Sequence, residues 1–209
     1  MEFAAARKVM VDSQVRVNDV TDRGLQAALL AVPRERFCAP GRAFVAYAEV
    51  EPEIAGDRRL MLAREVSKLL MAAEPQAGET ALAIAGPYAA AVLAQLGLTV
   101  TAQESDPSVL DVVAAGLADA GVATALQPLS RPVEGAWDII ISEGSVAARP
   151  DAWLAALKPG GRAVLVERSG PAGRAVLYVR GKGGLSRREL FEAAPPLLPE
   201  LTPAPTFVL

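Results

Sequence analysis

One short segment has the residue types and spacing of a nucleotide site. An apolar run, 81–85, ends at Gly86 and Pro87, and Glu104 follows about 20 residues after the turn. In a strand, turn and helix of this kind the turn lets a ligand approach the backbone, and the later acid accepts hydrogen bonds from a ribose. The spacing therefore predicts a nucleoside-type ligand, with Ala85, Gly86 and Tyr88 at the turn and Glu104 at the ribose.

The turn has little of the glycine that such a site needs. A G-x-G-x-x-G turn uses glycines for the tight bend and for close approach of the ligand. Here only Gly86 is present, and Pro87 has no N–H to offer an anion at the start of the helix. Two interpretations remain open: the site is lost, or a shorter alanine-rich loop supplies the same backbone donors by another path.

Ser142 and Glu143 are two further candidates for binding a cofactor. They come at the end of the strongly apolar segment 136–142, which is typical of a central strand. Ligands of open α/β sheets bind outside the carboxyl ends of the strands, so both residues are predicted near the ligand. A solvent-facing strand end explains them equally well.

Strands and helices alternate from residue 81 onward, which favours a parallel sheet with right-handed crossovers. The predicted strands are 81–85, 98–103, 122–126, 136–142, 162–167, 174–180 and 207–209, and the predicted helices are 88–96, 107–120 and 149–157. The segment 174–180 is expected to form a hairpin with the strand before it, and the turn 158–161 to feed that strand.

The first part of the chain reads as helical. Helices are predicted at 3–15, from Thr21 or Asp22 as cap to Pro33, and at 60–73. Between them we expect a charged loop, 33–41, and an exposed extended edge, 47–54. Residues 1–75 are thus predicted to form a helical extension packed on the same domain, and residues 76–209 to form the core.

Composition narrows the function classes. The 209 residues, 52% hydrophobic and 22% charged, fit one globular domain, and a net charge of -3 gives no support to a nucleic-acid or membrane partner held by bulk electrostatics. The chain has no histidine and a single cysteine, Cys38, so no metal site and no disulfide is predicted. No signal-peptide pattern is present, and a cytoplasmic protein is expected. The oligomeric state is not indicated.

A basic run surrounds the sequence GKGG near the carboxyl terminus. Its members are Arg180, Lys182, Arg187 and Arg188. The run lacks the G-x-x-x-x-G-K-[ST] spacing of a phosphate-binding loop, so we expect a solvated basic loop.

Several segments together carry a family resemblance. They are MVDSQVRVNDVTD at 10–22, VPRERFCAP at 32–40, AYAE at 46–49, ESDP at 104–107, WDIIISEG at 137–144 and LKPGGRAV at 157–164. The chain resembles protein-L-isoaspartate O-methyltransferases, class I methyltransferases that use S-adenosylmethionine. The segment VPRERF is the most specific, whereas LKPGGR is widespread in the superfamily.

This resemblance implies an α/β fold: a doubly wound, mostly parallel, seven-stranded Rossmann-like methyltransferase sheet with an N-terminal helical extension. It implies S-adenosylmethionine as cofactor and an isoaspartyl-containing peptide or protein as substrate. Glu104 matches the family's ribose-binding acid, whereas the turn at 85–87 is about two residues short. Residues 61–64 align with the family's serine-alanine-proline-histidine segment but keep neither serine nor histidine, so no catalytic residue is assigned.

Two functions follow from these departures. The first is isoaspartyl methyl transfer, weak or lost, which requires an open cavity between Gly86 and Glu104 that admits an adenosine. The second is a non-catalytic methyltransferase fold kept as a binding or scaffold module, with its crevice closed by Pro87 and Tyr88.

Overall fold

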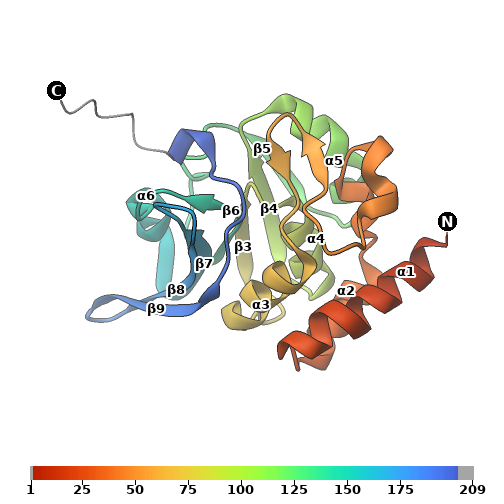
Figure 1. The fold of residues 1–209 in the computed structure, drawn as a ribbon. Helices are drawn as coiled ribbons and strands as arrows, with labels where there is room; N and C mark the ends of the chain where they lie inside the picture. The colour runs from red at the N-terminus through yellow and green to blue at the C-terminus, as the bar shows by residue number, and fades with distance from the viewer. Residues whose placement is uncertain (1, 202–209) are drawn as a thin grey trace.

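Seven strands form one mixed sheet in the computed structural model, which describes residues 2–201 (Figure 1). In spatial order the strands are β5 (Ala123–Leu126), β4 (Thr99–Glu104), β3 (Thr80–Ile84), β6 (Trp137–Val146), β7 (Leu157–Glu167), β8 (Arg174–Gly181) and β9 (Gly184–Glu192). A separate hairpin consists of β1 (Glu53–Ala55) and β2 (Arg58–Arg59). The predicted seven-stranded, mostly parallel sheet is confirmed.

The register of the parallel strands sets the position of the candidate site. Strands β5, β4, β3, β6 and β7 run parallel, while β8 is antiparallel to β7 and to β9. Ile84 lies opposite Gln103 on one side and Ser142 on the other. The residues that follow these three, Ala85, Glu104 and Glu143, therefore meet at the carboxyl edge of the sheet.

Both faces of the sheet are covered, but unequally (Figure 1). The helices are α1 (Phe3–Met10), α2 (Arg23–Ala31), α3 (Ala63–Ala73), α4 (Pro87–Gln95), α5 (Pro107–Asp119) and α6 (Asp151–Ala155). Helices α1 to α5 lie on one face, where Ala81 and Ala83 point. On the other face, Leu82 and Ile84 pack against loops and against α6, whose Trp153 is fully buried. A central strand buried on both faces explains the unbroken apolar run of β3.

The helix starts follow the predicted signals. Asp22 caps α2 by accepting a hydrogen bond from the Leu25 N–H at 2.6 Å. Pro87 occupies the first turn of α4, where its missing N–H has no intrahelical partner to lose. Asp106 caps α5 in the same way as Asp22, with a 2.8 Å bond from the Ser108 N–H.

The N-terminal region contains more helix than expected. Helix α1 continues as a π-helix, Val11–Val15, and a 3₁₀-helix, Arg16–Asn18. The segment predicted as a charged loop forms two further 3₁₀-helices, Arg34–Phe37 and Pro40–Val45, because Arg34 is buried rather than solvated and donates to the Ala46 carbonyl at 2.9 Å. Apolar residues of this region share one cluster with the sheet. The division of the chain at residue 75 stays a prediction.

Three predictions need correction, and a fourth lies outside the described residues. The basic run is not a loop: Arg187 and Arg188 lie on β9, whose alternating charges hide the apolar period of an ordinary strand. The turn 158–161 lies within β7, as an irregularity in its pairing with β6. Of the predicted edge 47–54 only Glu53 and Ile54 are in a strand. The strand predicted at 207–209 lies outside the described residues.

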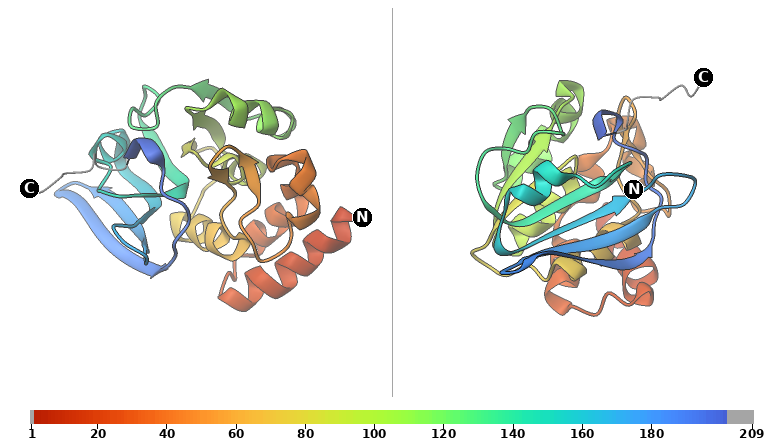
Figure 2. Two further views of the ribbon diagram at one scale, coloured as in Figure 1. Left: turned by 45° about the horizontal axis from the view of Figure 1, so that its top comes forward. Right: turned by 90° about the vertical axis from the view of Figure 1, so that its left-hand side faces the viewer.

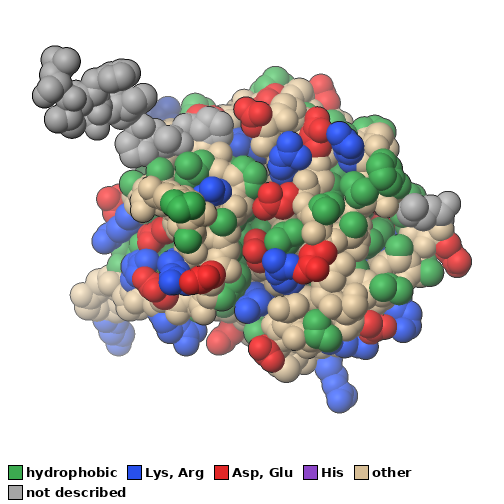
Figure 3. All heavy atoms as spheres, viewed as in Figure 1, with side chains coloured by type: hydrophobic (Ala, Val, Ile, Leu, Met, Phe, Trp, Pro, Cys, Tyr) green, Lys and Arg blue, Asp and Glu red, His purple; other side chains and the backbone are tan. Residues whose placement is uncertain are grey.

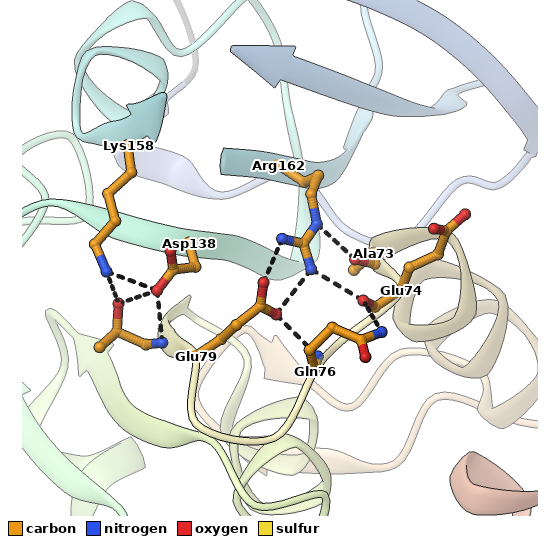
Figure 4. Close-up of polar contacts among 8 residues, drawn as sticks. Ala73, Glu74, Gln76, Glu79, Asp138, Lys158 and Arg162 are labelled. Atoms are coloured by element: carbon orange, nitrogen blue, oxygen red, sulfur yellow. Dashed lines mark hydrogen bonds and ion pairs between the residues drawn. The ribbon is translucent and has the colours of Figure 1, made fainter. Parts of the chain in front are cut away.

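A polar network joins the strands at the opposite, amino edge of the sheet (Figure 4). Asp138 accepts hydrogen bonds from the N–H and hydroxyl of Thr80 at 2.9 and 2.8 Å and pairs with Lys158 at 2.7 Å. Arg162 binds Glu79 through two nitrogens at 2.7 and 2.9 Å and donates to carbonyls at the end of α3. The network holds the starts of β3, β6 and β7 together.

Acidification tests the contribution of Asp138. Burial raises the pKa of Asp138, but the bonds from Lys158 and Thr80 outweigh it and lower the pKa to about 2. Because its pKa is lower in the folded state than in the unfolded state, Asp138 stabilises the fold above about pH 4. This stabilisation is lost as the pH falls toward about 2. Between these limits we expect wild type to lose about 1 kcal/mol more of its unfolding free energy than Asp138→Asn. Equal losses in urea titrations would contradict this.

Candidate functional site

The candidate site is the crevice, defined here as the space at the carboxyl edge of the sheet between Gly86 and Glu104. Glu104 is the last residue of β4, and Gly86 joins β3 to α4. The β1–β2 hairpin lies over this edge, as does the segment 195–198 (Figures 1 and 2). The crevice thus stands where open α/β sheets bind ligands.

Glu104 is fully engaged by the hairpin. Arg58 donates from Nε to one carboxylate oxygen at 3.0 Å and from a terminal nitrogen to the other at 2.8 Å. The N–H of Ser105 adds a 2.8 Å bond to the second oxygen. The side chains of Arg58 and Glu104 are only 12% and 4% exposed. Both oxygens that a ribose would need already have partners.

The turn bends at alanine rather than glycine. Ala85 has φ of 50°, in the left-handed region, and its N–H donates to the Gln103 carbonyl at 2.9 Å. This conformation costs an L-residue about 1–2 kcal/mol. Gly86 has φ of -134°, and a Cβ there would lie 3.5 Å from Glu143, an ordinary contact. The glycine that remains is therefore not at the position where glycine is most useful.

Glu143 occupies the start of α4. Its Oε1 accepts a hydrogen bond from the Ala89 N–H at 2.8 Å, and the residue is 2% exposed. A carboxylate at a helix N-terminus is favourable, and the helix N-terminus is also where nucleotide sites hold an anionic group of the ligand. Burial raises the pKa of Glu143, while the Ala89 N–H and Arg34 act against the rise. The donor of the helix thus points at the protein's own acid.

The other predicted residues do not face open space. Ser142 is fully buried, and its hydroxyl accepts from the Gly144 N–H at 3.3 Å. Tyr88 lies in the core, edge-to-face with Phe37 at 5.8 Å and 4.8 Å from the Arg34 guanidinium. Burial raises the pKa of Tyr88 to about 12. The expectation that Tyr88 closes the crevice is wrong, because its ring packs against the N-terminal region.

The crevice is instead closed by the β1–β2 hairpin and by the segment 195–198. Between Gly86, Pro87 and Glu104 the free volume is about 10 Å³, and it is about 10 Å³ again beside Arg58 and Leu198. Such a volume holds about one water molecule, whereas small-molecule sites span roughly 300–1,000 Å³. In this arrangement the crevice does not admit an adenosine.

The segment 195–198 covers the second side. Ser145 of β6 donates from its N–H to the Pro196 carbonyl at 2.9 Å, and its carbonyl accepts from the Leu198 N–H at 2.8 Å. The Leu198 side chain lies directly on Gly144, where a Cβ would have no room. Gly144 is therefore needed for this packing.

The segment aligned with the family's catalytic residues is only partly exposed. Met61 is fully buried, and its carbonyl accepts from Arg34, while Arg64 pairs with Glu49. Glu65, in the first turn of α3, is 7% exposed, and its Oε2 has no hydrogen-bond partner among residues 2–201. Burial raises the pKa of Glu65 to about 7.

Sequence reasoning missed both Arg58 and Glu65. For Glu65 the available signal was a charge within the apolar stripe of α3. For Arg58 there was no signal, since two adjacent arginines do not indicate a buried partner.

Residues 2–201 contain neither a membrane-spanning helix nor a cluster of metal ligands. Across this part of the chain no helix is long and apolar enough to span a membrane. The same residues hold no group of three or more histidine, cysteine or acidic side chains placed to bind a metal ion.

Comparison with known proteins gives curated relatives of one kind. No family model matches the chain. A protein-L-isoaspartate O-methyltransferase of Methylorubrum extorquens is 29% identical over 196 residues, covering 91% of this chain and 84% of the relative. One of Rhodopseudomonas palustris is 31% identical over 163 residues, covering 75% of each.

Solved structures agree in fold. A Plasmodium falciparum structure assigned to the same enzyme class, in complex with S-adenosyl-L-homocysteine, has a TM-score of 0.79 at 13% identity and covers 92% of this chain and 97% of its own. A second structure of a protein-L-isoaspartate O-methyltransferase has a TM-score of 0.75 at 18% identity, with 93% of this chain and 65% of that protein covered. The roles of Ala85, Gly86, Tyr88, Glu104, Ser142 and Glu143 toward a cofactor stay predictions.

The Arg58–Glu104 pair is testable by substitution. Arg58→Met leaves a buried carboxylate without its cation, so we expect a loss of about 3 kcal/mol in unfolding free energy. Arg58→Met combined with Glu104→Leu removes both charges and is expected to recover most of that loss. Denaturant unfolding measures both.

Arg59→Met is the matched control, because Arg59 is the exposed neighbour on the same strand. We expect it to change stability by less than about 0.5 kcal/mol. A double variant no more stable than Arg58→Met would contradict the assignment.

Proposed function

The chain belongs to the protein-L-isoaspartate O-methyltransferase family, and from this premise we propose that it is a non-catalytic member whose methyltransferase fold serves as a binding or scaffold module. The observation that carries this proposal is the Arg58–Glu104 pair. Both oxygens of Glu104, the acid predicted to hold a ribose, are bound by a side chain of the same molecule.

Energetics support this choice. A ligand that uses Glu104 must first displace Arg58, and separating a buried pair leaves two charges to be compensated. A cost of about 3 kcal/mol weakens binding by about 100-fold. The Ala89 N–H at the start of α4 is taken by Glu143 as well, so the ligand loses a second partner.

The residues present do not fit S-adenosylmethionine in this arrangement. About 10 Å³ is free between Gly86 and Glu104, and residues 61–64 offer neither the serine nor the histidine of the family segment. No reaction step is therefore assigned to these residues.

The second candidate is methyl transfer from S-adenosylmethionine to isoaspartyl carboxylates of a damaged peptide or protein. Family membership and the position of Glu104 at the end of β4 favour it. It requires the β1–β2 hairpin and the segment 195–198 to move away from the crevice. For either candidate we propose a cytoplasmic protein without nucleic-acid or membrane partners.

Calorimetry distinguishes the two candidates. We expect no heat when S-adenosylhomocysteine is added to this chain at millimolar concentration, while the Methylorubrum extorquens relative, run in parallel, gives a binding isotherm. Saturable binding to this chain would overturn the non-catalytic proposal.

A labelled-methyl assay on an isoaspartyl peptide completes the test. We expect no transfer above background with this chain. Transfer by wild type that is lost in Glu104→Gln would establish the second candidate, since the amide keeps the shape of the side chain but not the charge that the ribose-binding role uses.

A further inference from the structure

A second, larger hollow lies away from the crevice, beside the end of β7 and the start of β8. We name it the arginine pocket after Arg149, Arg168, Arg174 and Arg187, which line it together with Glu167 and Tyr178. Its volume is about 460 Å³, within the usual range of small-molecule sites. On the face seen in Figure 3, basic and acidic side chains gather in the region of β8 and β9.

Cations outnumber acids in the lining, four arginines to one glutamate. The glutamate, Glu167, is already bound: Arg187 donates to it at 2.7 and 3.1 Å, and the Tyr178 hydroxyl also bonds it. Three guanidinium groups therefore remain without an acid inside the pocket.

Arg168 is held in place by backbone oxygens rather than by an acid. Its Nε donates to the Gly170 carbonyl at 2.9 Å, and one terminal nitrogen donates to Ala194 and Pro195 at 3.0 and 3.1 Å. Carbonyls fix the orientation of the group but do not cancel its charge. Glu51 lies within electrostatic range, yet among the described residues no carboxylate forms an ion pair with Arg168.

Arg149 and Arg174 have partners that a ligand can replace. Arg149 pairs with Asp151, which is 77% exposed. Arg174 pairs with Glu192, which is 72% exposed, and lies 4.0 Å from Glu189, which is 56% exposed. Exposed pairs contribute little, because water and salt screen them. The Arg149 guanidinium also lies 6.0 Å from the centre of the Tyr178 ring, which limits its positions.

We propose that the arginine pocket binds a small ligand that carries two or more phosphate or carboxylate groups. Guanidinium groups bind both kinds of oxyanion through paired N–H donors, and one such ligand would satisfy several arginines at once. The pocket shares no lining residue with the crevice, so this proposal does not depend on whether the crevice binds a cofactor.

Titration calorimetry of the full chain at low ionic strength, with pyrophosphate and with citrate in separate runs, tests the proposal. We expect saturable binding of at least one. Tighter binding of pyrophosphate assigns a phosphorylated ligand, and tighter binding of citrate assigns a polycarboxylate. Heat from neither anion would overturn the proposal.

Variants locate the site. Arg168→Gln and Arg149→Gln are each expected to weaken binding by about tenfold or more, because each removes charged hydrogen bonds. If Arg168→Gln disturbs the segment that Arg168 holds, the result with Arg149→Gln decides whether the pocket binds the anion. Arg36→Gln is the matched control, an arginine outside the pocket that pairs with Asp119, and should bind as wild type. Equal weakening in Arg36→Gln, or none in Arg149→Gln, would overturn the assignment.

Discussion

A carboxylate buried at the end of β4 sets the main constraint on this molecule. Removing Glu104 from water costs several kcal/mol unless a cation and N–H donors compensate it. A bound ribose would offer hydroxyls, but here the compensation comes from Arg58, whose hairpin must then lie across the carboxyl edge of the sheet. The position of the hairpin over one side of the crevice follows from this pair, while the segment 195–198 covers the other side.

The same substitution of protein for ligand occurs at the start of α4. Glu143 gives the helix the negative group that a nucleotide site would otherwise receive from outside. Glu104 is therefore paired with a cation, and the first turn of α4 with an acid, both from the same molecule. Ala85 retains the left-handed turn between them although the residue is not glycine.

Local and regularly spaced features were predictable from the sequence. The apolar runs of β3 and β6, the proline at the start of α4 and the place of Glu104 each depend on a few neighbouring residues. Arg58 was not predictable, because it is 46 residues from Glu104 and no periodicity links the two. Strand β9 was missed for another reason: an edge strand exposed on most of its length carries charges where a buried strand carries apolar side chains. The burial of Tyr88 likewise depends on Phe37 and Arg34, far away in sequence.

The short pairing of Ser145 with the segment 195–198 also sets an order of events during synthesis. The hydroxyl of Ser145 bonds to the Pro195 carbonyl, which leaves the ribosome 50 residues later. The hairpin and strands β3, β4 and β6 precede that segment in the chain. The crevice therefore has its first cover, the hairpin, encoded well before the other. Its second cover arrives only after the meander of β7, β8 and β9 is complete.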